Sequence, residues 1–228
     1  MAKKYNILLF DIDDTLIDFA AVEKNSLKKV FFENKTELTD NILSTYKSIN
    51  NKLWRMYERG EKRLSDILTE RFYKTFEIFG INADGAAFNK RFLELLGENT
   101  IAVRGAAEVL NAVYGKYKIY AVTNGIADVQ KKRLKNVDFY KYFDCLFCSG
   151  DVGFQKPSME YYSYVLSHID EFEREKALII GDSPSTDLAG GVMLGIDACW
   201  YNPSGKTCDI YHKWEIKSIK ELLDILET

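Results

Sequence analysis

Short, largely apolar runs recur along the chain, and each ends in polar residues. They lie at Ile7–Phe10, Tyr117–Val122, Asp144–Cys148, Ala177–Ile180 and Ala198–Tyr201. A short apolar run bounded by polar residues predicts a buried β-strand. Helical patterns separate the later runs, at residues 126–135, 158–169 and 185–194, and a last helix is expected at 219–226. Alternating strands and helices predict an α/β fold with a Rossmann-like, doubly wound parallel sheet.

The interval between the first two predicted strands has a different pattern. It carries four helical stretches, at Glu23–Glu33, Asn41–Glu58, Leu64–Phe79 and Ala86–Leu96, and no strand pattern. Such an interval is too long for a crossover loop. We therefore expect an α-helical cap domain at residues 18–98, inserted into an α/β core domain formed by residues 1–17 and 99–228. Its position after the first strand predicts a lid that closes over the strand ends.

Composition narrows the possible partners. The 228 residues carry a net charge of −3 and show no basic patch, which argues against a nucleic-acid polymer as partner. The apolar run near the start is too short for a signal peptide or a membrane span, so we expect a cytoplasmic protein with no membrane partner. Cys145 and Cys148 would face opposite sides of a strand and would not converge on a metal. The oligomeric state stays open between monomer and homodimer.

Polar residues that can carry chemistry follow the predicted strands. They are Asp11 and Asp13 after the first strand, Thr123 and Asn124 at the end of the second, Lys156 in a loop, and Asp182 and Asp187 after the fourth. Ligands of open α/β sheets bind beyond the carboxyl ends of the strands. Carboxylates held close together repel and resist losing water unless a cation offsets the cost. Oxygen ligands of this kind predict Mg²⁺, held by Asp11, the backbone of Asp13 and Asp182, with Asp187 close by.

This residue set fits phosphoryl transfer through a covalent aspartyl phosphate. Asp11 would attack phosphorus, and Asp13 would protonate the leaving oxygen and then take a proton from water. Thr123 and the amide of Asn124 would hold phosphate oxygens, and Lys156 would neutralise charge.

Four motifs in this order resemble the haloacid-dehalogenase (HAD) superfamily. They are D-I-D-D-T at Asp11–Thr15, V-T-N at Val122–Asn124, Q-K-P at Gln155–Pro157 and G-D-S-P-S-T-D at Gly181–Asp187. The resemblance implies a sheet with strand order 3-2-1-4-5 and a mobile helical cap. Members that remove halide lack a carboxylate at the position of Asp13, so the resemblance favours a phosphohydrolase. Asp14 departs from the glycine that is commoner there.

A second resemblance concerns the substrate. Trp54–Glu61, Arg71-Phe72 and the stretch 190–203 are similar to bacterial pyrimidine 5′-nucleotidases. This implies an Mg²⁺-dependent phosphomonoesterase that acts on a small-molecule phosphomonoester, a pyrimidine nucleoside 5′-monophosphate. Three alternatives remain open: a phosphatase for phosphoglycolate, a sugar phosphate or FMN; a phosphomutase of the β-phosphoglucose type; and a binding protein without catalysis. Lys24, Lys28 and Lys29 leave room for phosphonate cleavage through a Schiff base.

Overall fold

The computed structural model describes residues 4–227, which form two compact units. One unit, the α/β unit, holds the chain up to Phe19 and from Ile101 onward, and the other, the helical unit, is Ala20–Thr100. The divisions fall at 19/20 and 100/101, each two residues later than the boundaries that the sequence suggested. Each unit is described below by itself.

A six-stranded parallel sheet forms the centre of the α/β unit. Its strands are β1 (Ile7–Phe10), β2 (Lys118–Thr123), β3 (Cys145–Cys148), β4 (Ala177–Gly181), β5 (Asp197–Tyr201) and β6 (Trp214–Ile216). They lie in the order β3-β2-β1-β4-β5-β6, which confirms the doubly wound parallel sheet and the expected order of its first five strands. The sequence did not predict β6, because three residues are too few to show a strand pattern.

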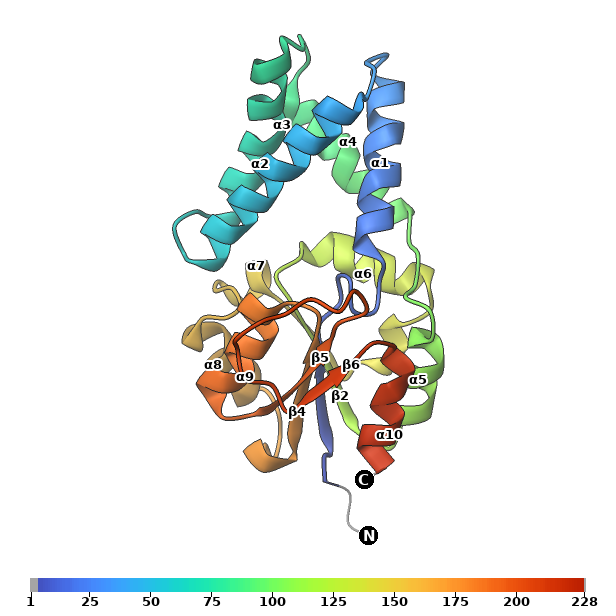
Figure 1. The fold of residues 1–228 in the computed structure, drawn as a ribbon, viewed down its shortest axis with the longest axis vertical. Coiled ribbons are helices and arrows are strands. Elements are labelled where there is room, and N and C mark those ends of the chain that lie inside the picture. Colours follow the sequence, from blue (N-terminus) through green and yellow to red (C-terminus); the bar gives the residue numbers. More distant parts are fainter. Residues whose placement is uncertain (1–3, 228) are drawn as a thin grey trace. The chain divides into compact units, whose positions relative to one another are not determined.

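Helices cover both faces of this sheet. They are α5 (Ala106–Val113), α6 (Ala127–Asn136), α7 (Ser149–Val152), α8 (Met159–Ser167), α9 (Ala189–Leu194) and α10 (Leu222–Glu227), with helical turns η1 (Tyr140–Tyr142), η2 (Arg174–Lys176), η3 (Pro184–Leu188) and η4 (Ile219–Glu221). In Figure 1, α8 and α9 lie on one side of the strands and α5 and α10 on the other. Tyr161 and Val165 of α8 pack in one apolar cluster with Ile7, Leu9 and Ile179. Since successive side chains of a strand point to opposite faces and helices cover both faces, every residue of β1 is buried.

The strand register brings the candidate residues to one edge of the sheet. Phe10, the last residue of β1, is level with Ala121 of β2 and Ile180 of β4. Because the strands are parallel, the residues that follow β1, β2 and β4 all emerge at that edge. This arrangement places Asp11 between the ends of its two neighbouring strands.

Four helices make up the helical unit, as the sequence predicted. They are α1 (Phe19–Glu33, whose first residue belongs to the α/β unit), α2 (Asp40–Glu58), α3 (Leu64–Phe79) and α4 (Gly85–Glu98). Aromatic rings from all four helices meet in the core, where Phe72 lies 4.9 Å from Phe88, 5.1 Å from Tyr46 and 5.4 Å from Phe92 between ring centroids. Phe31 of α1 packs edge-on against Phe88. Among residues 4–227, no helix combines the length and apolar character needed to cross a membrane.

Candidate active site

A buried lysine lies at the centre of the candidate site. Lys156 follows β3 and α7 in the chain and is only 1% exposed. Its ammonium donates to Oδ1 of Asp11 at 2.7 Å, to Oδ1 of Asp187 at 2.7 Å and to the carbonyl of Val122 at 2.9 Å. All three donors of an ammonium group are therefore satisfied. The structure brings together Asp11, Lys156 and Asp187, which lie far apart in the sequence.

The charges in this cluster shift one another's protonation. Burial raises the pKa of Asp11 to about 7, although the nearby Lys156 ammonium acts in the opposite direction. Burial alone would lower the pKa of Lys156, but the carboxylates of Asp11 and Asp187 raise it well above its usual range. Lys156 therefore stays protonated near neutral pH, and Asp11 is a group whose charge responds to its surroundings.

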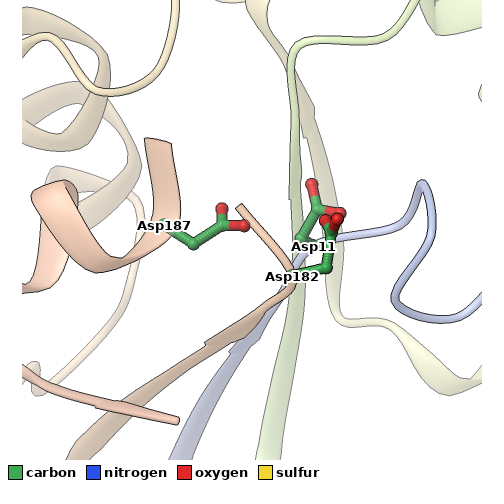
Figure 2. A group of neighbouring side chains, drawn as sticks. All are labelled: Asp11, Asp182 and Asp187. Atoms are coloured by element: carbon green, nitrogen blue, oxygen red, sulfur yellow. The ribbon is translucent and has the colours of Figure 1, made fainter. Parts of the chain in front are cut away.

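A third carboxylate, that of Asp182, completes the cluster. Burial, followed by repulsion from Asp11 and Asp187, raises the pKa of Asp182 to about 8. One carboxylate oxygen from each of these three residues lies within 4.8 Å of the others. Figure 2 shows Asp187 reaching from its helical turn toward the carboxylates of Asp11 and Asp182. All the donors are oxygens, and a hard divalent cation would offset the burial and repulsion that raise the pKa values of Asp11 and Asp182, so these residues fit a metal site.

Asp187 has two protein partners that fix its orientation. Its Oδ1 accepts from Lys156, and its Oδ2 accepts from the backbone amide of Ser183 at 3.2 Å. Gly181 makes room for it, because a Cβ at that position would lie 2.1 Å from Asp187 Oδ2. Each oxygen accepts one hydrogen bond and keeps a second lone pair, so Asp187 both orients Lys156 and remains available to a cation beside Asp11 and Asp182.

The two predicted phosphate-binding residues at the end of β2, Thr123 and Asn124, have different hydrogen-bond partners. The buried hydroxyl of Thr123 accepts from the amide of Gly125 at 2.9 Å and from Nε2 of Gln130 at 3.0 Å. Both of its lone pairs are used, so its proton is the part that is left to donate. The side chain of Asn124 instead bonds the backbone of Lys156 twice, at 2.8 and 3.0 Å, and so holds the lysine loop against β2.

Asp13 does not share the partners of Asp11. Its carboxylate turns toward α6, where Arg133 Nη1 donates to Oδ1 at 2.6 Å and Gln130 Nε2 donates to Oδ2 at 2.7 Å. The chain turns immediately afterwards at Asp14, which has a left-handed φ of 57°. The carboxylate of Asp13 is therefore not part of the three-carboxylate cluster, and only its backbone carbonyl remains a candidate metal ligand.

Sequence reasoning missed Gln130 and Arg133. Both are buried, at 0% and 1% exposure, although they sit in a helix rich in lysine. Residues three apart lie on the same face of a helix, so the two side chains can reach the same partner. The sequence signal that could have identified them is this polar pair, Gln130 and Arg133, on the helix face that has to pack against the sheet.

A pocket of about 470 Å³ opens beside this cluster within the α/β unit. Asp182 lines it together with Asp14, Asp18, Arg104 and Lys206. A volume of this size suits a small organic ligand.

The chain matches known proteins over nearly all of its length. The family model described as haloacid dehalogenase-like hydrolase matches residues 8–201. The HAD-hydrolase YfnB of Bacillus subtilis is 38% identical over 98% of this chain and 96% of its own, and its magnesium-bound crystal structure superposes with a TM-score of 0.95 over 99% of this chain and 100% of that one.

Two further relatives carry a substrate in their names. The pyrimidine 5′-nucleotidase PynA of Streptococcus pneumoniae is 33% identical over 98% of this chain and 95% of its own. The pyrimidine 5′-nucleotidase YjjG of Escherichia coli is 29% identical over 98% of both chains. With the four motifs gathered at one edge of the sheet, this chain belongs to the haloacid dehalogenase-like hydrolase family.

Proposed function

We propose that this hydrolase of phosphoric monoesters cleaves pyrimidine nucleoside 5′-monophosphates through an aspartyl-phosphate intermediate. The observation that carries the proposal is the buried Lys156, bonded to Asp11 and Asp187 beside Asp182. A cation next to a buried carboxylate provides both a nucleophile and a counter-charge for the phosphoryl group. The names of PynA and YjjG support the pyrimidine assignment.

The proposed reaction has two steps, and Asp13 moves a proton in each. Asp11 attacks phosphorus, the bond to the ester oxygen breaks, and a proton from Asp13 goes to that oxygen. Asp13 then takes a proton from water as the water oxygen displaces Asp11 from phosphorus and phosphate leaves. The Thr123 hydroxyl donates a hydrogen bond to a phosphate oxygen, and Lys156 balances negative charge in both steps.

The carboxylates of Asp11 and Asp182, together with the backbone carbonyl of Asp13, would hold Mg²⁺. When bound, the cation lowers the repulsion between an anionic nucleophile and an anionic phosphate. The fit rests on three carboxylate oxygens within 4.8 Å of one another and on the raised pKa values of Asp11 and Asp182. Magnesium suits a site with few carboxylates, because it keeps several waters and binds substrate phosphate.

The pocket beside Asp182 has room for the part of the substrate that leaves. Its volume of about 470 Å³ lies within the range of small-molecule sites, about 300–1,000 Å³. Arg104 and Lys206 among its lining residues offer donors to the oxygens of a nucleoside. We propose this pocket as the place of the nucleoside next to the phosphate.

Phosphate release across a panel of esters tests the proposal. The panel holds UMP, dUMP, dTMP, CMP, AMP, GMP, phosphoglycolate, FMN and sugar phosphates, each with Mg²⁺. We expect UMP, dUMP or dTMP to give the highest kcat/KM. A profile led by phosphoglycolate or a sugar phosphate would keep the chemistry of Asp11 and discard the pyrimidine assignment.

One substitution tests the nucleophile separately from the substrate. We expect Asp11→Asn to abolish turnover of every ester while the circular dichroism spectrum stays that of the parent protein. Asp128→Asn, at an exposed position of α6, serves as the matched control and should leave turnover unchanged. Turnover by the Asp11→Asn variant near the parent rate would refute the aspartyl-phosphate assignment.

A further inference from the structure

Both oxygens of the Asp13 carboxylate are held by one helix. Arg133 Nη1 lies 2.6 Å from Oδ1, and Gln130 Nε2 lies 2.7 Å from Oδ2. The two donors are also joined to each other, because Arg133 Nη1 donates to Gln130 Oε1 at 3.0 Å. Asp13, Gln130 and Arg133 thus form a closed set of three side chains, in which the carboxylate has no rotational freedom left without breaking a hydrogen bond.

The arginine in this set is not a surface residue. Its side chain is 1% exposed, and its guanidinium carbon lies 5.3 Å from the centroid of the Phe19 ring. Among residues 4–227, its Nε and Nη2 have no hydrogen-bond partner. Leaving such donors buried costs free energy, and an apolar side chain of similar size would fill the space without that cost. The charge that Arg133 presents to Asp13 is therefore what distinguishes it from a packing residue.

Gln130 connects the same set to the end of β2. Its Nε2 donates to Thr123 Oγ1 at 3.0 Å as well as to Asp13. Room for this amide comes from Gly125, where a Cβ would lie 2.2 Å from Nε2. The loop after β2 therefore leaves room for the Gln130 side chain, which lies between the proposed acid–base residue and the proposed phosphate-binding hydroxyl.

We propose that Gln130 and Arg133 are positioning residues that hold the Asp13 carboxylate in place for proton transfer. This inference rests on the proposed function, in which Asp13 gives a proton to the leaving oxygen and later accepts one from water. Gln130 and Arg133 touch neither the phosphate nor the leaving group. Arg133 acts through Asp13 alone, whereas Gln130 holds Asp13 and also bonds the Thr123 hydroxyl.

The proposal predicts which esters are cleaved more slowly when the hydrogen bonds to Asp13 are lost. A nucleoside leaves as an alkoxide unless its oxygen is protonated, whereas p-nitrophenolate is stable enough to leave without a proton. Misplacing Asp13 should therefore slow cleavage of a nucleotide much more than cleavage of p-nitrophenyl phosphate. The kcat/KM value is the informative one, because it covers the steps up to departure of the alcohol.

Arg133→Met and Gln130→Met test this expectation with both esters. We expect Arg133→Met to lower kcat/KM for the best nucleotide substrate by about 10²-fold, the loss that a displacement of about 1 Å can cause. The loss for p-nitrophenyl phosphate should stay below about tenfold, since general acid catalysis, worth about 10²–10⁴-fold, is not needed there. Gln130→Met should also slow the nucleotide more than p-nitrophenyl phosphate, with a loss common to both esters added because Gln130 bonds Thr123 as well. Arg133→Lys should recover part of the activity.

Asp13→Asn and Lys132→Met provide the controls. In the Asp13→Asn background, adding Arg133→Met should change kcat/KM no further, because the residue through which Arg133 acts is already lost. Lys132→Met removes an exposed cation from the same helix and should behave as the parent protein. Equal losses for the two esters, or additive losses in the Asp13→Asn background, would overturn the proposal and leave Arg133 as a structural residue. A parent protein that releases phosphate from no ester would instead refute the proposed function.

Discussion

Replacing Lys156 by methionine removes a buried charge and keeps most of the side-chain length. In the parent protein the ammonium makes two charge-assisted hydrogen bonds of 2.7 Å, to Asp11 and to Asp187. Each hydrogen bond to a charged group is worth about 1.5–3 kcal/mol. Breaking a buried ion pair from one side costs about 3–5 kcal/mol, because the other charge is left uncompensated. The two arguments agree, so we expect Lys156→Met to lower the free energy of unfolding by several kcal/mol.

This loss should depend on pH in a definite direction. The pKa of Asp11 is about 7 in the folded chain, above its usual value, and Lys156 lowers it. Without the ammonium, the pKa of Asp11 rises further, and the carboxyl escapes part of the repulsion by keeping its proton. A raised carboxyl pKa gives stability that is present at low pH and is lost as the pH rises through the folded value. The difference between variant and parent should therefore be smaller at about pH 5.5 than at about pH 8.5.

Urea unfolding in EDTA, followed by circular dichroism at both pH values, measures this difference. Lys176→Met is the matched control, because its 2.7 Å ion pair with Glu173 is about half exposed. Such surface pairs contribute about 0–1 kcal/mol, so the control should lose no more than that. A loss for Lys156→Met as small as that of Lys176→Met, or one that is the same at both pH values, would refute the reasoning.

Three further predictions concern the same carboxylates. Gly181→Ala places a Cβ 2.1 Å from Asp187 Oδ2. We therefore expect urea unfolding to show a free energy of unfolding that is lower by about 1–3 kcal/mol, together with a fall in kcat. Stability equal to that of the parent protein would show that Asp187 moves freely. Protons compete with a cation for Asp11 and Asp182, whose pKa values are about 7 and about 8. The affinity for Mg²⁺ should therefore fall as the pH is lowered from about 9 to about 6. Isothermal titration calorimetry measures this affinity; an affinity independent of pH would contradict the assignment of these two carboxylates, and EDTA should silence turnover until Mg²⁺ is restored.

Much of the fold could be predicted because its signals are local. Residues Leu64–Phe79 were predicted as one helix, and α3 has these same bounds. The strand Ile7–Phe10 also has the predicted bounds, since four apolar residues run directly into aspartate. Strand β6 (Trp214–Ile216) was missed, because it holds three residues and its central Glu215 is exposed. A strand that owes its place to pairing with β5 leaves little trace in its own sequence.

The candidate site could be predicted only in part, for a related reason. Motif residues that follow strands, such as Asp11 and Asp182, are found from their position, since parallel strands bring their ends together. Which partner each carboxylate faces is decided by rotamers and by loop geometry. Asp13 lies two residues from Asp11 but bonds Arg133, more than a hundred residues away. A contact of such sequence separation has no counterpart in the local pattern.

The arrangement of charges gives one reason why the cluster suits a divalent cation. When Asp11, Asp182 and Asp187 are all ionised, Lys156 balances one of their three negative charges and two remain. A chain without a cation can relieve that excess only by keeping protons on Asp11 and Asp182, and their raised pKa values show this tendency. A protonated Asp11 is a poor nucleophile. A divalent cation supplies the two positive charges that are missing, so its binding favours the ionised, reactive form of Asp11. The carboxylate of Asp13 has a counter-charge of its own in Arg133, although its negative charge still helps to raise the pKa of Asp11. The geometry thus gives the residue proposed to attack phosphorus and the residue proposed to move protons different cationic partners, Lys156 and Arg133.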